Sequence, residues 1–420
     1  MLSGLWQTFA MRSAHLGALW LLAALPAADA SDWPQFLGPT RDGVYAGNDL
    51  GETWPKEGPP IVWQKTVGQG FSGPVVAAGK LVLFHRLGDR EVVECLEAAS
   101  GKALWSFGYA TGYHDQIAGE DHGPRATPAI AGGKVFTFGA EGKLHCLTLA
   151  SGERAWAVDT RADYGAREGF FGFGCSPLIE GSAALLNLGG LPGAGIVALG
   201  AENGKLLWKA TDDEASYSSP IVAPLENQRV ALFLTRAGLV GLEPASGAIR
   251  FTFPWRSRMH ASVNAATPVV VDDLVFLSAS YQTGAVLLRA RGAKLETVWS
   301  GDDVLSNHYG TSVHWNGYLF GFDGRQEQGP RLRCVELRTG KIRWTQEGLG
   351  AGSLLVTPTR LLALLESGLL LAIAKDPDRF RETGRAQLLG SGVRACPALA
   401  DGRLYARGAG RLVCVDLRKR

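Results

Sequence analysis

The side chains best suited to chemistry gather in segments between predicted strands. The densest group is His114, Asp121 and His122, with Arg125 three residues further on. Histidine combined with carboxylate is common at zinc, manganese and iron sites. These residues form no compact ligand motif, however, so we interpret the group as a hydrogen-bonded polar loop and predict no metal site.

Aromatic and arginine side chains characterise the later loops. This composition is enriched at binding hot spots and also suits sugar rings. The alternative is that the aromatic rings are internal packing, which would make Arg125 and Arg258 buried cations in need of partners such as Asp121 or Asp163. The candidate ligand- or partner-binding residues are His114, Asp121, His122, Arg125, Tyr164, Arg167, Phe171, Tyr217, Arg258, His260, Asn264 and His308.

Several function classes lack a signal in the chain. No nucleophile elbow and no recognisable pair of catalytic carboxylates appears, so we assign no catalytic residue. The chain has 42 basic and 40 acidic residues, and no basic run beyond Arg418, Lys419 and Arg420. Nucleic-acid binding needs a basic surface, so we expect no nucleic-acid partner.

The first 30 residues are typical of a signal peptide. An apolar run from Leu16 to Leu25 follows Arg12, and the small-residue triplet Ala28-Asp29-Ala30 follows Pro26. This run is too short to span a bilayer core of about 30 Å, and no later segment is long and apolar enough to do so. We expect cleavage near Ala30 and a soluble, monomeric protein in the periplasm or outside the cell. Met11 is an alternative initiator.

The six cysteines do not form a predicted disulfide framework. Cys95, Cys146, Cys334 and Cys414 occupy one repeat position, and Cys175 and Cys396 occupy a second. Equivalent residues of a repeat lie on different structural units, which places most of them too far apart to pair. We therefore predict buried free thiols.

An internal repeat predicts the fold. Its marker is a glycine four residues before a large aromatic residue, in a strand, turn, strand pattern. The marked segments are Leu96 to Trp105, Leu147 to Trp156, Leu199 to Trp208, Leu242 to Phe251 and Val335 to Trp344. A proline-led strand and an alternating strand precede the hairpins, as in Thr127-Pro128 and Lys134 to Phe138. Each repeat is thus a sheet of four short antiparallel strands.

The repeat interval predicts an all-β, eight-bladed propeller. The closing residues are Trp63, Trp105, Trp156, Trp208, Phe251, Trp299, Trp344 and Leu388, spaced 42 to 52 residues apart. That interval is the size of a propeller blade. The last blade ends one strand short, whereas residues 61–67 form a lone strand, so we predict that this N-terminal strand closes the ring. The expected domains are a signal peptide (1–30), an extended segment (31–57) and the propeller (58–420).

The repeats resemble those of the pyrroloquinoline-quinone-like (PQQ-like) propeller superfamily, whose pattern is Ala-Leu-Asp-x-x-Thr-Gly-x-x-x-Trp. The segments Trp33-Pro-Gln-Phe-Leu-Gly-Pro-Thr-Arg-Asp-Gly43 and His122-Gly-Pro-Arg-Ala-Thr-Pro128 are similar to those of exported bacterial members. The resemblance implies an eight-bladed ring, related to the lipoprotein scaffold of the outer-membrane assembly machinery and to quinoprotein alcohol dehydrogenases. Such a fold implies architecture more than activity.

The resemblance leaves two functions to compare. A quinoprotein dehydrogenase holds PQQ over a tryptophan floor, ligates Ca²⁺, uses an aspartate base and caps the cofactor with a disulfide between adjacent cysteines. This chain has no adjacent cysteine pair. We therefore expect a non-catalytic scaffold with no cofactor, which binds a protein or a polysaccharide at the mouth of the central channel. A PQQ- and Ca²⁺-dependent oxidoreductase is the alternative.

Overall fold

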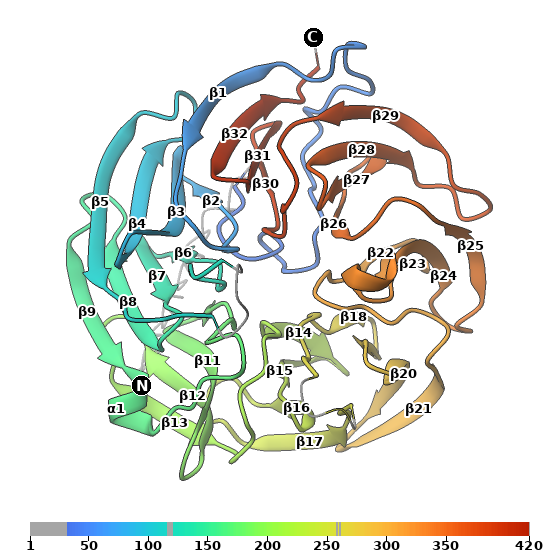
Figure 1. The fold of residues 1–420 in the computed structure, drawn as a ribbon. Helices are drawn as coiled ribbons and strands as arrows, with labels where there is room; N and C mark the ends of the chain where they lie inside the picture. The colour runs from blue at the N-terminus through green and yellow to red at the C-terminus, as the bar shows by residue number, and fades with distance from the viewer. Residues whose placement is uncertain (1–31, 116–120, 258, 260–261, 420) are drawn as a thin grey trace, which may run out of the picture.

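The computed structural model describes residues 32–115, 121–257, 259 and 262–419. Within these ranges the chain forms a ring of eight four-stranded antiparallel sheets (Figure 1). The predicted eight-bladed propeller is therefore confirmed. The signal-peptide prediction and the candidates Arg258 and His260 lie outside the described residues.

Each blade runs from the channel outward in chain order. The first four blades are formed by β2 (Val75–Ala77), β3 (Lys80–Leu87), β4 (Arg90–Glu97) and β5 (Ala103–Ala110); β6 (Ala129–Ala131), β7 (Lys134–Phe138), β8 (Lys143–Thr148) and β9 (Arg154–Asp159); β10 (Leu178–Glu180), β11 (Ala183–Gly190), β12 (Ala194–Gly200) and β13 (Leu206–Ala210); and β14 (Ile221–Leu225), β15 (Gln228–Leu234), β16 (Gly238–Leu242) and β17 (Ile249–Pro254).

The remaining blades follow the same order, except that the last takes its outer strand from the N-terminus. They are formed by β18 (Val269–Val271), β19 (Leu274–Ala279), β20 (Gly284–Arg291) and β21 (Lys294–Gly301); β22 (Val313–Trp315), β23 (Tyr318–Asp323), β24 (Arg331–Glu336) and β25 (Ile342–Gln346); β26 (Gly352–Val356), β27 (Arg360–Leu365), β28 (Leu369–Ala374) and β29 (Glu382–Gln387); and β30 (Ala398–Ala400), β31 (Arg403–Gly408), β32 (Arg411–Asp416) and β1 (Ile61–Thr66). Two short helices, α1 (Thr160–Tyr164) and η1 (Gln326–Gln328), lie in connecting loops.

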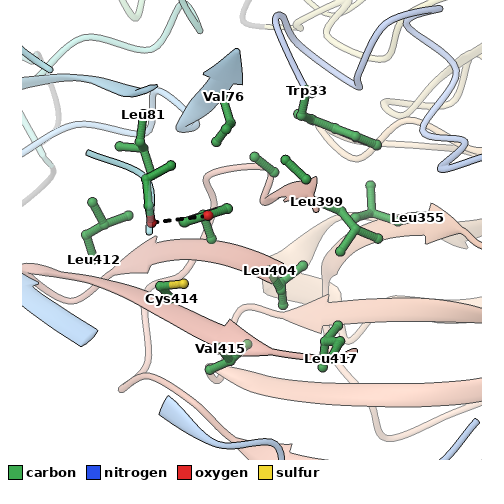
Figure 2. Close-up of a cluster of buried hydrophobic side chains, with 14 of the residues drawn as sticks. Trp33, Val76, Leu81, Leu355, Leu399, Leu404, Leu412, Cys414, Val415 and Leu417 are labelled. Carbon is green, nitrogen blue, oxygen red and sulfur yellow. Dashed lines mark hydrogen bonds between the residues drawn. The ribbon is translucent and has the colours of Figure 1, made fainter. Parts of the chain in front are cut away.

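The hydrophobic core lies between the blades. The middle strands are buried on both faces, as β11 and β12 are along their whole lengths, so each sheet needs a neighbour on either side. The outer strands alternate between exposed and half-buried positions, as in β9. One hydrophobic cluster of this core joins blade eight to the N-terminal segment through Trp33, Leu399 and Leu404 (Figure 2). All six cysteines are free thiols, and all but the half-buried Cys396 are buried, as predicted.

The repeat aromatic joins each blade to the next. The indole Nε1 of Trp105 donates to the carbonyl of Leu149 in blade two at 2.9 Å, and Trp208 and Trp299 make the same bond to Pro244 and Leu337. The indole ring lies against the turn glycine of the next blade, Gly152 in the case of Trp105. The shared glycine of the repeat therefore allows both the tight turn and the close packing of the indole against it.

Strand β1 closes the ring as predicted. It pairs antiparallel with β32, with Trp63 opposite Cys414 and Thr66 opposite Arg411. The indole of Trp63 donates to the carbonyl of Ala98 at 3.0 Å, which continues the tryptophan docking from blade eight to blade one. The last blade thus combines the two ends of the described chain.

The segment before β1 crosses the centre of the ring, where Figure 1 draws it in blue. Trp33 pairs with Val76 of blade one, and Tyr45 donates its backbone N–H to Val356 of blade seven at 2.8 Å. Arg41 reaches the opposite side and donates to the carbonyls of Pro177 and Pro220. Burial lowers the pKa of Arg41 to about 9, so it remains a cation at neutral pH. We call residues 32–52 the plug.

No helix in the described part of the chain is long and apolar enough to cross a membrane.

Candidate functional site

A cavity of about 680 Å³ lies at the centre of the ring. Its walls come from the loops that lead into the first strand of a blade and from those that join the second and third strands, because both kinds of loop meet on one face of a propeller. Its described lining is Phe36, Leu37, Phe71, Arg125, Thr127, Phe170, Phe171, Gly174, Ser176, Tyr217, Ser219, Met259, Val263, Ala265, Tyr281, His308, Tyr309, Gly310, Thr311, Arg325, Gln326, Glu327, Ser353, Leu354, Arg394 and Cys396.

The plug contributes to the cavity wall. Phe36 and Leu37 of the plug line the cavity, and Leu37 is 3% exposed. The backbone of Leu37 has a φ of 59°, a left-handed conformation uncommon for a residue other than glycine. The plug therefore turns sharply where it meets the cavity and presents an apolar surface to it.

Hydroxyl groups just before the innermost strands line part of the cavity. Each accepts a backbone N–H from the preceding blade at 3.0 Å: Gly73 donates to Thr127, Thr127 to Ser176, Ser176 to Ser219, and Thr267 to Thr311. The hydroxyl hydrogens of Thr127, Ser176, Ser219 and Thr311 have no acceptor among the described residues. We call these four residues the hydroxyl belt.

Arginine and aromatic side chains line another part of the cavity. The Arg125 guanidinium lies 5.0 Å from the ring centres of both Phe71 and Phe171, and that of Arg325 lies 4.6 Å from the ring centre of Tyr281. Arg394 lies 5.3 Å from the ring of Phe71. Guanidinium groups stack favourably on aromatic faces, so these contacts hold both kinds of side chain in place.

Three carboxylates hold the arginines. Arg125 pairs with the buried Asp115, and Arg394 Nε lies 2.5 Å from Glu366 Oε1. Neither Asp115 nor Glu366 lines the cavity, so these carboxylates lie behind the guanidinium groups. Glu327, which does line it, lies 2.5 Å from Arg325 and is half exposed.

His308 is fixed between two polar neighbours. Its Nε2 lies 2.8 Å from the hydroxyl of Tyr281, and its Nδ1 contacts Oε1 of Gln326. Burial lowers the pKa of His308 and favours the neutral ring. An amide oxygen accepts only, so Nδ1 carries the proton and Nε2 accepts from Tyr281. His308 is therefore a neutral member of a hydrogen-bonded wall.

The structure brings together Arg125, Phe171, Tyr217 and His308 of the sequence-derived candidates, which all line the cavity. Asn264 supports this group from behind. Its backbone carbonyl accepts the N–H groups of Tyr217 and Ser218, and its amide donates to the carbonyl of Thr235 at 2.9 Å.

Other candidates lie away from the cavity lining. Tyr164 ends helix α1 and packs against the core between blades two and three, and Arg167 is exposed. His122 accepts the backbone N–H of Asp115 through Nδ1 at 2.9 Å, and its ring lies 5.4 Å from that of His114. His114 and His122 therefore contact residues of their own loop and not the cavity.

The carboxylate that pairs with Arg125 is Asp115, and not Asp121 or Asp163, which the sequence suggested as partners if Arg125 were buried. Asp121 accepts the backbone N–H of Gly123 at 2.8 Å, and Asp163 lies in α1, whereas Asp115 pairs with Arg125. The side chain of Asp115 is buried, so the fold directs it inward. In the described part of the chain no group of three histidine, cysteine or acidic residues could hold a metal ion.

Several lining residues were missed by sequence reasoning. Tyr281 and Arg325 lie in loops between the second and third strands, and Arg394 lies in the loop that leads into blade eight. The hydroxyl belt carried a usable signal, because Thr127, Ser176 and Ser219 each precede a proline that leads into an innermost strand. No local pattern marks the loop residues, since only ring closure brings them together.

The described lining does not match the donor set that PQQ with Ca²⁺ requires. It contains no tryptophan for a floor, and its apolar surface comes from Phe36 and Leu37 of the plug. Its carboxylate is Glu327, which is engaged by Arg325, so the oxygen ligands that Ca²⁺ prefers are not assembled among the described residues. We therefore derive no chemistry through this cofactor.

The ring of four-stranded blades and its tryptophan docking define a propeller of the PQQ-like class. A family model described as outer membrane protein assembly factor BamB matches residues 89–346, more than half of the chain. The chain belongs to this family, which confirms the predicted resemblance.

Similar solved structures include a BamB protein and an alcohol dehydrogenase. BamB of Moraxella catarrhalis has a TM-score of 0.63 at 16% identity, covering 86% of this chain and 98% of that one. Quinohemoprotein alcohol dehydrogenase of Comamonas testosteroni has a TM-score of 0.63 at 14% identity, covering 93% and 81%. At these identities the two structures show the fold alone.

One sequence relative is an enzyme by name. Quinohemoprotein alcohol dehydrogenase ADH-IIG of Pseudomonas putida is 30% identical over 141 residues, which is 32% of this chain. The match covers 18% of that relative, so the chain spans less than a fifth of its length there.

Proposed function

We propose that the chain is an exported, non-catalytic binding scaffold whose ligand or partner enters the cavity at the channel mouth. The observation that carries this proposal is the cavity itself, which combines aromatic rings with arginine side chains held by carboxylates behind them. Pockets of about 300–1,000 Å³ with apolar walls and a few placed polar groups are typical binding sites. The family description as an assembly factor also favours a binding role.

We also propose that the chain performs this role after export. The first 30 residues have the pattern of a signal peptide, which supports cleavage near Ala30 and action as a monomer in the periplasm or outside the cell. The partner is a protein or a polysaccharide.

Affinity capture with the mature chain tests the proposed surface. The bait is wild type or the double variant Phe171→Ala, Arg325→Glu, exposed to periplasmic extract and to cell-envelope polysaccharide. We expect the double variant to lose at least one component that wild type retains. Arg338→Glu is the matched control, because Arg338 is exposed in the turn between β24 and β25 on the other face. Equal recovery of every component by wild type and double variant would contradict the proposal.

A PQQ-dependent oxidoreductase is the second candidate, favoured by the match to a quinohemoprotein alcohol dehydrogenase. It is tested by adding PQQ and Ca²⁺ to the mature chain. Quinone absorbance that survives desalting, together with dye-linked alcohol oxidation, would reverse the ranking of the two functions.

A further inference from the structure

The described cavity wall offers a set of hydroxyl donors. Each hydroxyl of the belt accepts a backbone N–H through one lone pair and keeps its own O–H to donate toward the cavity. Tyr217 repeats this arrangement, since its hydroxyl accepts the N–H of Phe171 at 2.8 Å. The hydroxyl of Tyr309 is buried and has no partner among the described residues. A ligand with several hydrogen-bond acceptors would satisfy these O–H groups.

The guanidinium groups add charged donors. Arg125, Arg325 and Arg394 all line the cavity, whereas the carboxylates of Asp115 and Glu366 lie behind it. A guanidinium has five N–H donors in a planar fork, which matches the two oxygens of a carboxylate. The charged side-chain acceptor in the described lining is Glu327, and Arg325 engages it.

The aromatic rings define the shape of the ligand. Phe71, Phe171, Tyr217 and Tyr281 surround the same space, and Phe36 closes part of it. Aromatic faces pack well against the C–H faces of a ring that carries polar groups at its edge. Inorganic anions lack such a ring. Neutral sugars carry one, but they have no negative charge to meet the guanidinium groups of Arg125, Arg325 and Arg394.

We propose that the cavity binds the uronic acid residues of an acidic polysaccharide, with the sugar carboxylate at the arginines and the ring between the aromatic side chains. The hydroxyl belt donates to the ring and glycosidic oxygens. This inference rests on the proposed function, because it names the ligand of the same cavity.

Titration calorimetry on the mature chain tests the ligand class directly. The probes are trimers of galacturonate, mannuronate and guluronate and a glucuronate-containing oligosaccharide, with methyl-esterified trigalacturonate as the neutral match. We expect at least one acidic trimer to bind, and its methyl ester to bind at least about tenfold more weakly, because esterification removes the charge-assisted bonds to arginine.

Two variants locate the binding in the cavity. Tyr309→Phe removes a hydroxyl without breaking a described hydrogen bond and should weaken binding about fivefold, and Arg325→Gln should weaken it more than about tenfold. Tyr318→Phe and Arg338→Gln are the matched controls, since both residues lie outside the lining and should leave affinity unchanged. Thermal unfolding checks that each variant is folded.

The outcomes separate this inference from the function on which it rests. Absence of binding by every acidic probe, equal affinity for acid and ester, or full affinity in both cavity variants would overturn the uronate assignment. If envelope components are still lost by Phe171→Ala, Arg325→Glu, the binding scaffold stands and only the ligand class fails. Retention of PQQ in the same cavity would overturn both.

Discussion

At the scale of single residues, buried histidines couple the stability of the ring to pH. His145 lies 4.2 Å from the ring of Tyr109 in a stacked arrangement and 5.3 Å from that of Phe107. Burial, with the positive charges of Arg154 and Lys143, lowers the pKa of His145 to about 4. The imidazole of His145 is therefore neutral in the folded protein at pH values where an exposed histidine is already protonated.

His85, which is buried in strand β3 of blade one, is also neutral in the folded protein. Its Nδ1 accepts the backbone N–H of Gly68 at 2.8 Å, and Glu94 lies 3.5 Å from Nε2. Burial, with the positive charges of Arg407 and Lys65, lowers the pKa of His85 to about 4. Protonation thus opposes folding at both histidines.

Acid should destabilise the ring between pH 6.5 and pH 4. In this window the unfolded chain binds protons at both histidines and the folded chain does not, so stability is complete above about pH 6.5 and falls as the pH drops toward 4. Each histidine contributes a slope of at most about 1.4 kcal/mol per pH unit. Urea unfolding at pH 7 and pH 4.5 measures this loss.

His145→Phe keeps the aromatic stack and should reduce the loss, whereas His114→Gln, at an exposed position, serves as the control. An unchanged pH dependence in His145→Phe would contradict the assignment.

At the scale of single elements, the docking of one blade on the next depends on the turn glycine. Gly152 has a φ of 74°, and a Cβ there would overlap the ring of Trp105. Gly133 has a φ of 72° but faces open space. Alanine at Gly133 therefore changes the free energy of unfolding through the backbone conformation alone, whereas alanine at Gly152 must also displace the tryptophan.

Gly152→Ala should be clearly more destabilising than Gly133→Ala. A left-handed residue other than glycine costs about 1–2 kcal/mol, and overpacking adds about 1–3 kcal/mol at Gly152 only. Denaturant unfolding of both variants measures the difference in the free energy of unfolding. Similar values for the two alanine variants would mean that the indole moves aside freely, and that the glycine serves the turn alone.

At the scale of the whole molecule, the N-terminal part has two separable roles. Strand β1 completes blade eight, and the plug contacts the innermost strands of blades one and seven and the loops that lead into blades three and four. The connection between them includes exposed residues from Thr53 to Glu57, so the two parts can be removed separately.

Stepwise N-terminal truncation should lower the melting temperature in two stages. A chain that starts at Thr53 lacks the plug, leaving the carbonyls of Pro177 and Pro220 without Arg41, and a chain that starts at Gly68 also exposes the edge of β32. Differential scanning calorimetry measures both steps against the mature chain. A melting temperature in the Gly68 variant equal to that of the mature chain would refute the role of β1 in closure.

Much of the architecture could be predicted because it is written in local, repeated patterns. The glycine and tryptophan of each hairpin recur at a blade-sized interval, and the incomplete last repeat together with the lone strand at residues 61–67 predicted the pairing of β1 with β32. The free cysteines followed from the same repeat. These features depend on strand, turn and spacing, which neighbouring residues determine.

The composition of the cavity was decided by the tertiary structure alone. Phe36, Arg125, Tyr281, Arg325 and Arg394 come from loops spread over the chain, and no local spacing relates them. Likewise, the sequence indicated an extended segment before the propeller, but not that Arg41 would cross the ring and donate to blades three and four. Closing the ring determines which loops share the central space. It also buries Asp115, and a buried carboxylate needs a cationic partner, which Arg125 provides.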